Sequence, residues 1–495
     1  MRLFFGKIDN DKLLYENVKV KMEKSFVIKP VRNIDKMIHR FNNFIKAANL
    51  KYNKYQEDGL KWCLLQEKIN SGGIIADEMG LGKTILSLGL IISNVKSRTL
   101  IVLPSILVNQ WESIIKNKLN MKPVVYYGVN RNRITRDELI NSKIVITTYG
   151  VVAQIDTDRK NKSLKNENYL ADIEWSRIIF DEAHHMRNRK TKKYTSSMKL
   201  NSPIKWCITG TPIQNRINDL VSLFTILNYD RKYIIKNKEL LIEEKILRRK
   251  KEDVGLILPK LNQINVTITW KSIAEKILCK KFDFTRNSKP NKLKTHLCSS
   301  HLTEYLRGRQ ICISPLLLKN KVEELVDQGL LKEKYKTLFN GSSKINGVIE
   351  VIKRNKNDNK KIVFCHFNEE MDLLYDELTY NKYYNHDEIF KVNGNVSNIE
   401  RKMILENSDT KILIIQIQTG CEGLNLQQYN EIYFVSPSWN PSIEDQAIAR
   451  CHRYGQEKEV YVYKFYMENL SNQINMDSYI DNTQENKREL MTIID

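Results

Sequence analysis

Short apolar runs without polar alternation recur along the chain, and they predict buried β-strands. In a parallel sheet covered on both faces, strands appear as near-continuous hydrophobic runs of this kind. Segments between the runs, such as 84–95 and 369–379, have apolar residues at helical spacing. This alternation predicts an α/β fold with two parallel-sheet lobes. The runs occupy residues 73–76, 99–104, 143–149, 177–182, 205–210, 361–367, 389–394, 411–419, 431–437 and 461–466.

The predicted strands form two groups, separated by a segment rich in Lys and Leu. This segment has no strong strand pattern before residues 263–270, and it contains the basic run LRRKKED. We expect it to be a mainly helical, basic bridge. The expected organisation is a basic N-terminal extension (1–50), a first lobe (51–229), the bridge (230–340), a second lobe (341–470) and a polar tail (471–495).

Charge and cysteine content narrow the classes of partner. The 495 residues include 80 Lys and Arg against 58 Asp and Glu, for a net charge of +22. A basic surface of this size suits nucleic acid, although solvated surface lysines in a Lys- and Asn-rich chain are the alternative. The 8 cysteines form no C-x-x-C pair, so we expect no structural zinc site, and a reducing compartment fits best. We expect no secretory signal in the N-terminal residues MRLFFGKIDNDKLL, because they have no long apolar core, and no apolar run is long enough to span a membrane.

The first candidate site is a glycine-containing loop between a predicted strand and a predicted helix. Its sequence, DEMGLGKT, fits G-x-x-x-x-G-K-[ST] except that Asp77 stands at the first glycine position. Gly80 and Gly82 allow the backbone N–H groups to surround a phosphate at the helix N-terminus. Lys83 would reach the β- and γ-phosphates, and the Thr84 hydroxyl would bind Mg²⁺. The alternative is an ordinary glycine turn that leads into a helix.

The second candidate site is RIIFDEAHH, where an apolar strand ends in two carboxylates. Asp181 at the end of the strand would hold the Mg²⁺ of a nucleotide. Glu182 would orient and deprotonate the attacking water. On its own this motif is equally typical of a solvated loop, but the upstream phosphate loop favours the catalytic interpretation.

DEMGLGKT followed by DEAHH resembles the superfamily-two helicases and, within them, the Swi/Snf-type DNA-translocating ATPases. In that family the loop commonly has Asp at the position of Asp77. The resemblance implies two RecA-like lobes, with ATP and Mg²⁺ as cofactors. It implies nucleotide contacts along the whole loop, which comprises Asp77, Glu78, Met79, Gly80, Leu81, Gly82, Lys83 and Thr84.

Four further first-lobe segments match the family in order. KYQEDGLKW resembles the segment in which a glutamine, here Gln56, reads the adenine edge. LPSILVNQW and TTYG resemble segments that touch the DNA backbone, which makes the hydroxyls of Ser105, Thr147 and Thr148 candidate phosphate donors. ITGTPIQN resembles the segment that couples hydrolysis to movement of the lobes.

The bridge contains ILRRKKEDVGLILPK, which is similar to the family's link between lobes. One interpretation is a brace that carries Arg248 and Arg249 near nucleotide or DNA. The other is a solvated helix face on which these arginines pair with Glu252 and Asp253.

QTGCEGLNLQQ resembles a second-lobe segment in which glycines, here Gly420 and Gly423, let the backbone approach DNA or the nucleotide cleft. Cys421 stands where the family usually has Gly, which weakens any detailed prediction for this turn.

QAIARCHRYGQ resembles the family motif Q-x-x-x-R-x-x-R-x-G-Q, with Ala449 in place of a usual Gly. The spacing of three predicts that Arg450 and Arg453 lie on one face of a helix. Arginine stays charged and offers a planar fork, so it suits the γ-phosphate in the transition state. Arg453 is the stronger candidate for this role, with Arg450 as a phosphate-binding neighbour.

The expected function is an ATP-dependent translocase that moves along or remodels duplex DNA or protein–DNA complexes, held mainly by phosphate contacts. A strand-separating helicase, a viral transcription-associated ATPase and a catalytically silent DNA-binding scaffold are the alternatives. A chromatin or transcription complex is a candidate partner. The expected location is the nucleus or a viral replication or transcription compartment, and no membrane partner is expected.

Overall fold

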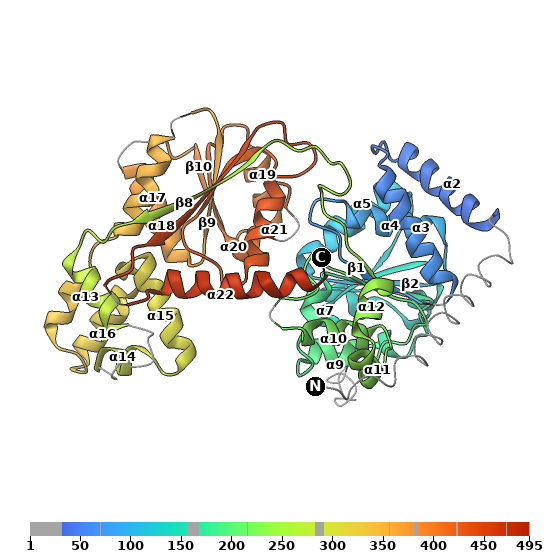
Figure 1. The fold of residues 1–495 in the computed structure, drawn as a ribbon, viewed down its shortest axis with the longest axis horizontal. Coiled ribbons are helices and arrows are strands. Elements are labelled where there is room, and N and C mark those ends of the chain that lie inside the picture. The colour runs from blue at the N-terminus through green and yellow to red at the C-terminus, as the bar shows by residue number, and fades with distance from the viewer. Residues whose placement is uncertain are drawn as a thin grey trace, which may run out of the picture.

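The protein has two α/β lobes connected side by side, as the computed structural model shows (Figure 1). The N-terminal half forms one lobe, and the C-terminal half forms the other. No helix within the described parts of the chain is long and apolar enough to cross a membrane. The structure describes residues 32–69, 71–155, 168–214, 216–282, 292–355, 357–380, 384–421, 424–471 and 473–494.

The first lobe is built on a seven-stranded parallel sheet in the order β3-β4-β2-β5-β6-β1-β7. Its central strands are buried along their whole length, which explains their continuous apolar sequences. Because all strands run in one direction, their carboxyl ends meet at the same edge of the sheet. The strands are β1 (Gly73–Ile75), β2 (Thr99–Leu103), β3 (Val124–Val125), β4 (Ile144–Thr148), β5 (Arg177–Asp181), β6 (Lys205–Ile208) and β7 (Ile246–Leu247).

Helices cover the first sheet, and two apolar cores fill the space between sheet and helices. Part of the predicted N-terminal extension belongs to this lobe, since helix α2 packs its Phe41 against the chain at Gly89. A Cβ at Gly89 would lie 2.6 Å from the Phe41 ring, so only glycine permits this approach. The helices are α2 (Arg32–Ala47), α3 (Lys54–Lys68), α4 (Lys83–Ser93), α5 (Val108–Leu119), α6 (Arg136–Asn141), α7 (Tyr149–Val152), α9 (Lys192–Ser197), α10 (Asn218–Ile226), α11 (Arg231–Lys236) and α12 (Lys238–Lys245).

The second lobe is built on a six-stranded parallel sheet in the order β10-β11-β9-β12-β13-β8. The two parallel sheets confirm the predicted fold class. The strands are β8 (Leu261–Ile268), β9 (Lys360–Cys365), β10 (Ile389–Val392), β11 (Ile412–Gln416), β12 (Tyr429–Phe434) and β13 (Val460–Met467). The helices are α17 (Ser343–Arg354), α18 (Asn368–Tyr380), α19 (Asn398–Glu406), α20 (Ile417–Cys421), α21 (Pro441–Cys451) and α22 (Met476–Met491).

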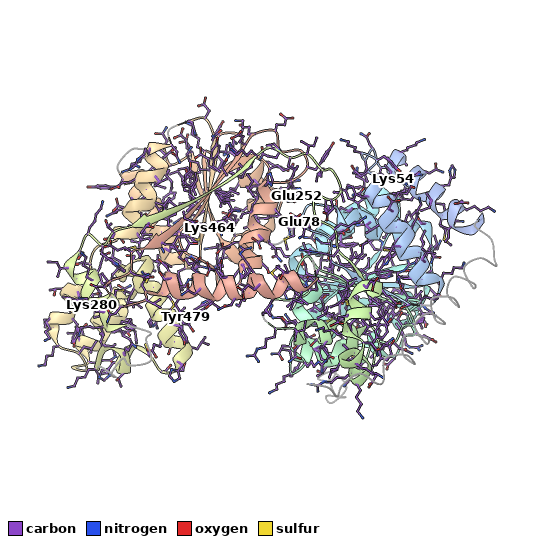
Figure 2. All side chains as sticks on the ribbon, in the orientation of Figure 1. Lys54, Glu78, Glu252, Lys280, Lys464 and Tyr479 are labelled. Carbon is purple, nitrogen blue, oxygen red and sulfur yellow. The ribbon has the colours of Figure 1, made fainter. Side chains whose placement is uncertain are left out.

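The segment between the lobes, residues 230–340, is mainly helical but also supplies one strand to each sheet. Strand β7 pairs with β1, and β8 pairs with β13. Glu252, in the connection between β7 and β8, lies where the two lobes meet, as does Glu78 (Figure 2). The remaining helices enclose a small apolar core of their own. They are α13 (Ile273–Lys281), α14 (Lys292–Leu297), α15 (His301–Ile313) and α16 (Lys319–Asp327). The five segment boundaries stay predictions.

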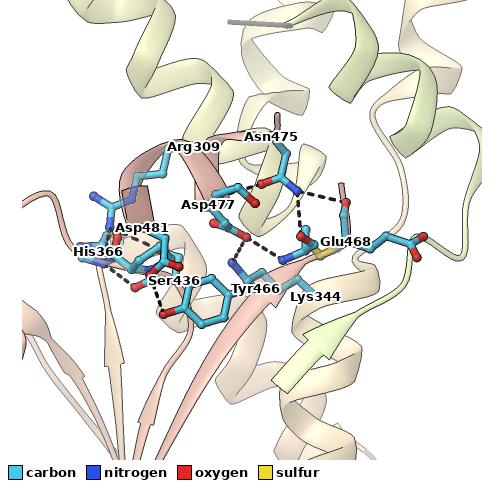
Figure 3. Close-up of polar contacts among 12 residues, drawn as sticks. Arg309, Lys344, His366, Ser436, Tyr466, Glu468, Asn475, Asp477 and Asp481 are labelled. Carbon is cyan, nitrogen blue, oxygen red and sulfur yellow. Dashed lines mark hydrogen bonds and ion pairs between the residues drawn. The ribbon is translucent and has the colours of Figure 1, made fainter. Parts of the chain in front are cut away.

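The predicted polar tail contains helix α22, which extends from the second lobe to the first (Figure 1). Near its start, the carboxylate of Asp477 accepts hydrogen bonds from Lys344 Nζ at 2.7 Å and from the Met467 N–H at 2.9 Å (Figure 3). Near its end, Leu490 packs against the core of the first lobe. The helix therefore contacts both lobes.

Candidate active site between the lobes

One pocket between the lobes brings together the sequence motifs that predicted a nucleotide site. It encloses about 130 Å³, which is smaller than the roughly 300–1,000 Å³ of typical ligand pockets. A nucleotide therefore requires the lobes to move apart as it enters. The first lobe contributes Met79, Gly80, Gly82, Lys83, Thr84, Leu107, Gln110, Trp111, Asp181, Glu182 and Gly210, and the second contributes Gln446, Ala449, Arg450 and Arg453.

The phosphate loop owes its shape to two glycines in the left-handed region. Gly80 has φ 95° and Gly82 has φ 80°, values that other residues adopt only with strain. Helix α4 begins at Lys83, directly after Gly82, and no side chain caps its first turn. Its N–H groups therefore remain available to an anion in the pocket.

Lys83 points back at its own loop. Its Nζ donates a hydrogen bond to the Asp77 carbonyl at 2.7 Å and approaches the Glu78 carbonyl at 3.4 Å. Desolvation in the pocket lowers the pKa of Lys83, while the negative charges of Glu182 and Asp77 oppose this shift. A bound phosphate would replace the carbonyls as the acceptor and would supply the negative charge that favours the ammonium form.

Asp181, the last residue of β5, is 8% exposed and is held by three donors. Trp111 Nε1 donates to Oδ2 at 2.8 Å, and the Glu182 N–H donates to Oδ1 at 3.0 Å. The Tyr149 hydroxyl donates to the Asp181 carbonyl at 2.7 Å. Burial, followed by the charge of Glu182, raises the pKa of the Asp181 carboxyl to about 6.

Glu182 adopts φ 49°, an uncommon conformation for a residue with a side chain. Its Oε2 lies 3.2 Å from His184 Nδ1, which is also 3.4 Å from the Thr209 hydroxyl. Burial opposes ionisation, but His184 and Lys83 lower the pKa of Glu182 to about 2. The carboxylate is thus kept ionised beside the pocket, as a group that receives a proton from water must be.

The pocket fits a hard cation. Two neighbouring carboxylates and the Thr84 hydroxyl face one space, and burial together with the charge of Glu182 raises the pKa of Asp181. Mg²⁺ takes oxygen ligands and keeps several from water and phosphate. Within the described ranges, no group of three or more His, Cys, Asp or Glu residues is arranged to hold a metal. A metal at Asp181 and Thr84 would therefore depend on the nucleotide for further ligands.

Arg450 and Arg453 reach the pocket from the second lobe, but they do not share a helix. Helix α21 ends at Cys451, and His452 leaves helical geometry with φ −93° and ψ 80°. The predicted common helix face is therefore wrong, because His452 turns away to donate a hydrogen bond to the Pro259 carbonyl at 2.7 Å. Both arginine side chains nevertheless line the pocket. Burial and then the charge of Arg450 lower the pKa of Arg453.

Asp77 and Glu78 direct their side chains away from the pocket and toward the segment between the lobes. Asp77 forms a two-bonded ion pair with Arg249, whose Nε lies 2.9 Å from Oδ1. Glu78 Oε1 lies 3.3 Å from Lys251 Nζ. Arg248 donates to the carbonyl of Ala76, directly before the loop, at 2.8 Å and to the carbonyl of Gly210 at 3.1 Å. Arg248 and Arg249 therefore do not lie on a solvated helix face, and they do not line the nucleotide pocket. Instead they bind the side of the phosphate loop that faces away from the pocket.

Comparisons with known proteins agree with this arrangement. Residues 55–232 match the SNF2-related domain, and residues 343–455 match the helicase conserved C-terminal domain. Together the two matches cover more than half of the chain. The chain belongs to the SNF2-related family. This confirms the family resemblance seen in the sequence.

Three relatives illustrate the range of the SNF2-related family. The chain is 29% identical over 464 residues to chromodomain-helicase-DNA-binding protein 8 of Danio rerio, covering 84% of this chain and 18% of that protein. It is 25% identical over 472 residues to the ISWI chromatin-remodeling complex ATPase ISW2 of Saccharomyces cerevisiae, covering 86% and 40%. It is 26% identical over 451 residues to a probable global transactivator of Orgyia pseudotsugata multicapsid polyhedrosis virus, covering 85% and 86%.

The chain spans less than a fifth of the chromodomain relatives it matches. Among solved structures, it is similar to the Sulfolobus solfataricus SWI2/SNF2 ATPase core in complex with dsDNA. That likeness has 24% sequence identity and a TM-score of 0.39, and it covers 90% of this chain and 92% of the other.

Gln56 lies over the SNF2-type phosphate loop rather than inside the pocket. It is 5% exposed, and its Nε2 donates to the Leu81 carbonyl at 3.2 Å. A Cβ at Gly82 would lie 2.5 Å from this amide nitrogen, so the second glycine is required for the contact as well as for its φ value. Recognition of adenine by Gln56 stays a prediction.

A larger hollow of about 680 Å³ lies beside the nucleotide pocket on the first lobe. It is lined by residues from the two segments expected to touch DNA, including Ser105 and Thr148, and by the basic side chains of Arg131 and Lys193. Thr147 does not belong to this surface. It is fully buried and donates to the Tyr126 carbonyl at 2.9 Å, so its predicted phosphate contact is wrong.

Gly420 packs inside the second lobe. A Cβ at this position would lie 2.6 Å from the Phe364 ring, so the glycine permits helix α20 to approach β9. The expectation that its backbone approaches DNA or the cleft stays a prediction. Gly423 lies outside the described residues, as does Asn215 at the end of the ITGTPIQN segment.

Sequence reasoning missed the residues that hold the catalytic side chains in place. Trp111 ends the segment LPSILVNQW, and Tyr149 lies within TTYG, but the sequence prediction for these segments names only their hydroxyl residues. Both aromatic residues bond to Asp181, because β2 lies between β4 and β5 and the segments after these strands meet at one edge of the sheet. The signal available in the sequence was an indole and a phenol in the segments that follow two buried strands.

Proposed function

We propose that this chain hydrolyses ATP to ADP and phosphate and uses the cycle to move along or remodel duplex DNA. The observation that carries the proposal is the meeting of Lys83, Asp181 and Glu182 with Arg450 and Arg453 in one pocket between two lobes. Membership of the SNF2-related family and the name of the yeast relative, a chromatin-remodeling ATPase, support the same activity.

Each residue has a role that its position allows. Lys83 and the first N–H groups of α4 bind the phosphates, and Thr84 and Asp181 hold Mg²⁺, which neutralises charge on the phosphates. Glu182 orients the attacking water and receives its proton. Arg453, with Arg450 beside it, stabilises charge on the γ-phosphate when the lobes close. Since half of the site comes from each lobe, hydrolysis requires closure and product release requires opening.

Duplex DNA is the partner that the surface chemistry favours. The chain has a net charge of +22, and the hollow beside the nucleotide pocket carries Arg131 and Lys193. Backbone contacts of this type carry no sequence information, so binding should depend weakly on sequence and strongly on salt. The names of the chromodomain and ISWI relatives support a chromatin complex as the load, in the nucleus, and that of the baculoviral relative supports a viral transcription complex.

The test measures phosphate release with duplex DNA, single-stranded DNA or RNA added to wild type and to Lys83→Ala. We expect the duplex to stimulate wild type most and the variant to be inactive with every nucleic acid. Lys116→Ala is the matched control, because Lys116 is an exposed lysine of the same lobe that pairs with Glu112. Equal rates in wild type and Lys83→Ala would overturn the proposal. Release of a strand from a forked duplex would instead identify a strand-separating helicase.

A further inference from the structure

The nucleotide pocket and the larger hollow beside it share a wall built from the segments that follow three neighbouring strands. Strand β2 pairs with β4 through Leu103 and Thr148, and with β5 through Val102 and Phe180. The segments that follow these three strands therefore lie together at one edge of the sheet. The first of them extends from one cavity to the other, since Ser105 lines the hollow and Trp111 lines the nucleotide pocket.

Both segments expected to touch DNA contain an aromatic donor to Asp181. Trp111 is 2% exposed, and its indole N–H holds Asp181 Oδ2 at 2.8 Å. Tyr149 is also 2% exposed; it lines the hollow, and its hydroxyl holds the Asp181 carbonyl at 2.7 Å. The residues that position Asp181 therefore belong to segments that line the neighbouring hollow.

We propose that Trp111 is a positioning residue: when a DNA backbone occupies this hollow, Trp111 changes how the Asp181 carboxylate is oriented toward Mg²⁺. Tyr149 assists Trp111 in this role. The inference rests on the proposed function, since it assigns the way in which DNA regulates the same site. With Oδ2 held by the indole, the carboxylate presents a fixed set of lone pairs to the pocket. A shift of the segment that begins at Ser105 moves the indole, because helix α5 follows directly after it.

The first experiment measures ADP affinity of the full chain during a Mg²⁺ titration and in excess EDTA. Trp111→Phe keeps a buried ring but removes the donor. Loss of a hydrogen-bond partner behind a metal-binding side chain typically weakens metal binding by about 10–100-fold. We therefore expect the Mg²⁺ midpoint to rise by about that factor, while ADP affinity in EDTA stays within about twofold of wild type.

Trp175→Phe is the matched control. Trp175 is a fully buried tryptophan of the same lobe, and its indole donates to the Leu170 carbonyl at 2.9 Å. This variant loses an equivalent hydrogen bond away from Asp181, so we expect its Mg²⁺ midpoint to equal that of wild type. Equal rises in both tryptophan variants, or a midpoint within twofold of wild type in Trp111→Phe, would overturn the inference. If Trp111→Phe does not fold, Tyr149→Phe is titrated instead. A Mg²⁺ midpoint of Tyr149→Phe equal to that of wild type would also overturn the inference.

The second experiment repeats the titration with saturating duplex DNA. We expect the duplex to shift the Mg²⁺ midpoint of wild type and to leave that of Trp111→Phe unchanged. If wild type and Trp111→Phe respond equally, the coupling is wrong while the proposed function stands. If the duplex alters neither turnover nor the Mg²⁺ midpoint of wild type, both the coupling and the proposed function are wrong.

Discussion

The carboxylate of Asp77 and the guanidinium of Arg249 form a buried two-bonded ion pair that ties the phosphate loop to the segment between the lobes. Asp77 is 1% exposed and occupies the position where the general phosphate-loop pattern has its first glycine. Arg249 also donates to the Tyr55 carbonyl. The departure from the general pattern is therefore a structural contact, and the loop depends on a residue far away in the sequence.

Asp77→Gly should weaken this protein even though it restores the general phosphate-loop sequence. The change leaves the Arg249 guanidinium partly buried without its carboxylate, and breaking a buried pair in this way costs about 3–5 kcal/mol. We expect urea unfolding to show a loss near the lower end of that range, because the Arg249 side chain is 15% exposed. ATP affinity should fall as well, since the loop loses its support.

Asp77→Gly combined with Arg249→Met is the companion variant. Removing both charges eliminates the unpaired guanidinium, so the double variant should recover part of the free energy of unfolding. If Asp77→Gly unfolds at the same urea concentration as wild type, the ion pair does not support the loop.

Arg453→Lys should abolish most ATP turnover while leaving nucleotide binding nearly intact. Lysine keeps the charge but lacks the planar fork, and an arginine in this role contributes roughly 10³–10⁵ in rate. We expect turnover at saturating ATP to fall toward the lower end of that range, and Arg450→Lys to affect ATP affinity more than turnover. Arg488→Lys is the control, because Arg488 lines an adjacent cavity between the lobes and pairs with Asp445 at 3.1 Å. A turnover in Arg453→Lys equal to that of Arg488→Lys would assign the role to another residue.

Much of the fold could be predicted because its signals are local. Every predicted apolar run coincides with a strand, since strands buried on both faces need continuous apolar sequence. Strands β3 and β7 escaped prediction because each has only two residues, too few for a pattern. The glycine-dependent shape of the phosphate loop also follows from its own residues.

The contacts that position the catalytic groups could not be predicted, because they join distant parts of the chain. Trp111 and Asp181 are 70 residues apart, and Asp77 and Arg249 are 172 residues apart. Which side chain meets which depends on the order of strands in the sheet, and that order is not the order in the sequence. Thr147 shows the reverse case, since alternation along β4 turns its hydroxyl into the protein and away from the surface.

Lys344→Met should destabilise the second lobe and release helix α22. Lys344 and Asp477 are fully buried and lie 2.7 Å apart (Figure 3). Removal of the lysine leaves a buried carboxylate unpaired, at a cost of about 3–5 kcal/mol. We expect this loss in urea unfolding, together with faster hydrogen exchange across Met476–Met491.

Two variants test whether the Lys344 effect comes from the buried charge. Lys344→Met with Asp477→Asn should recover stability, because the amide oxygen still accepts from the Met467 N–H without a charge. Lys271→Met, which breaks an exposed pair with Glu350, should cost no more than about 1 kcal/mol. Equal losses in Lys344→Met and Lys271→Met would contradict the anchoring role of the buried pair.

Glu370→Gln should change how the stability of the second lobe depends on pH. Glu370 is fully buried, and its Oε2 accepts hydrogen bonds from the N–H groups of His366 at 2.7 Å and Phe367 at 3.1 Å. Burial raises the pKa of its carboxyl to about 7, although these hydrogen bonds and the charge of Arg309 oppose the shift. A folded-state pKa above the unfolded value means that this group stabilises the protein fully below pH 4.5, and that the stabilisation disappears as pH rises through 7.

The size of this effect follows from the shift, since one pKa unit corresponds to about 1.4 kcal/mol. The free energy of unfolding of wild type, relative to Glu370→Gln, should therefore fall by about 3 kcal/mol between pH 4.5 and pH 7.5. Glutamine is a suitable reference because its amide oxygen can accept the same two N–H groups and does not titrate in this range. Other titrating groups, including the buried His366, are common to both proteins and cancel in the difference. Urea unfolding at several pH values measures the difference in free energy of unfolding between wild type and Glu370→Gln. If this difference stays constant across the pH range, Glu370 is ionised throughout.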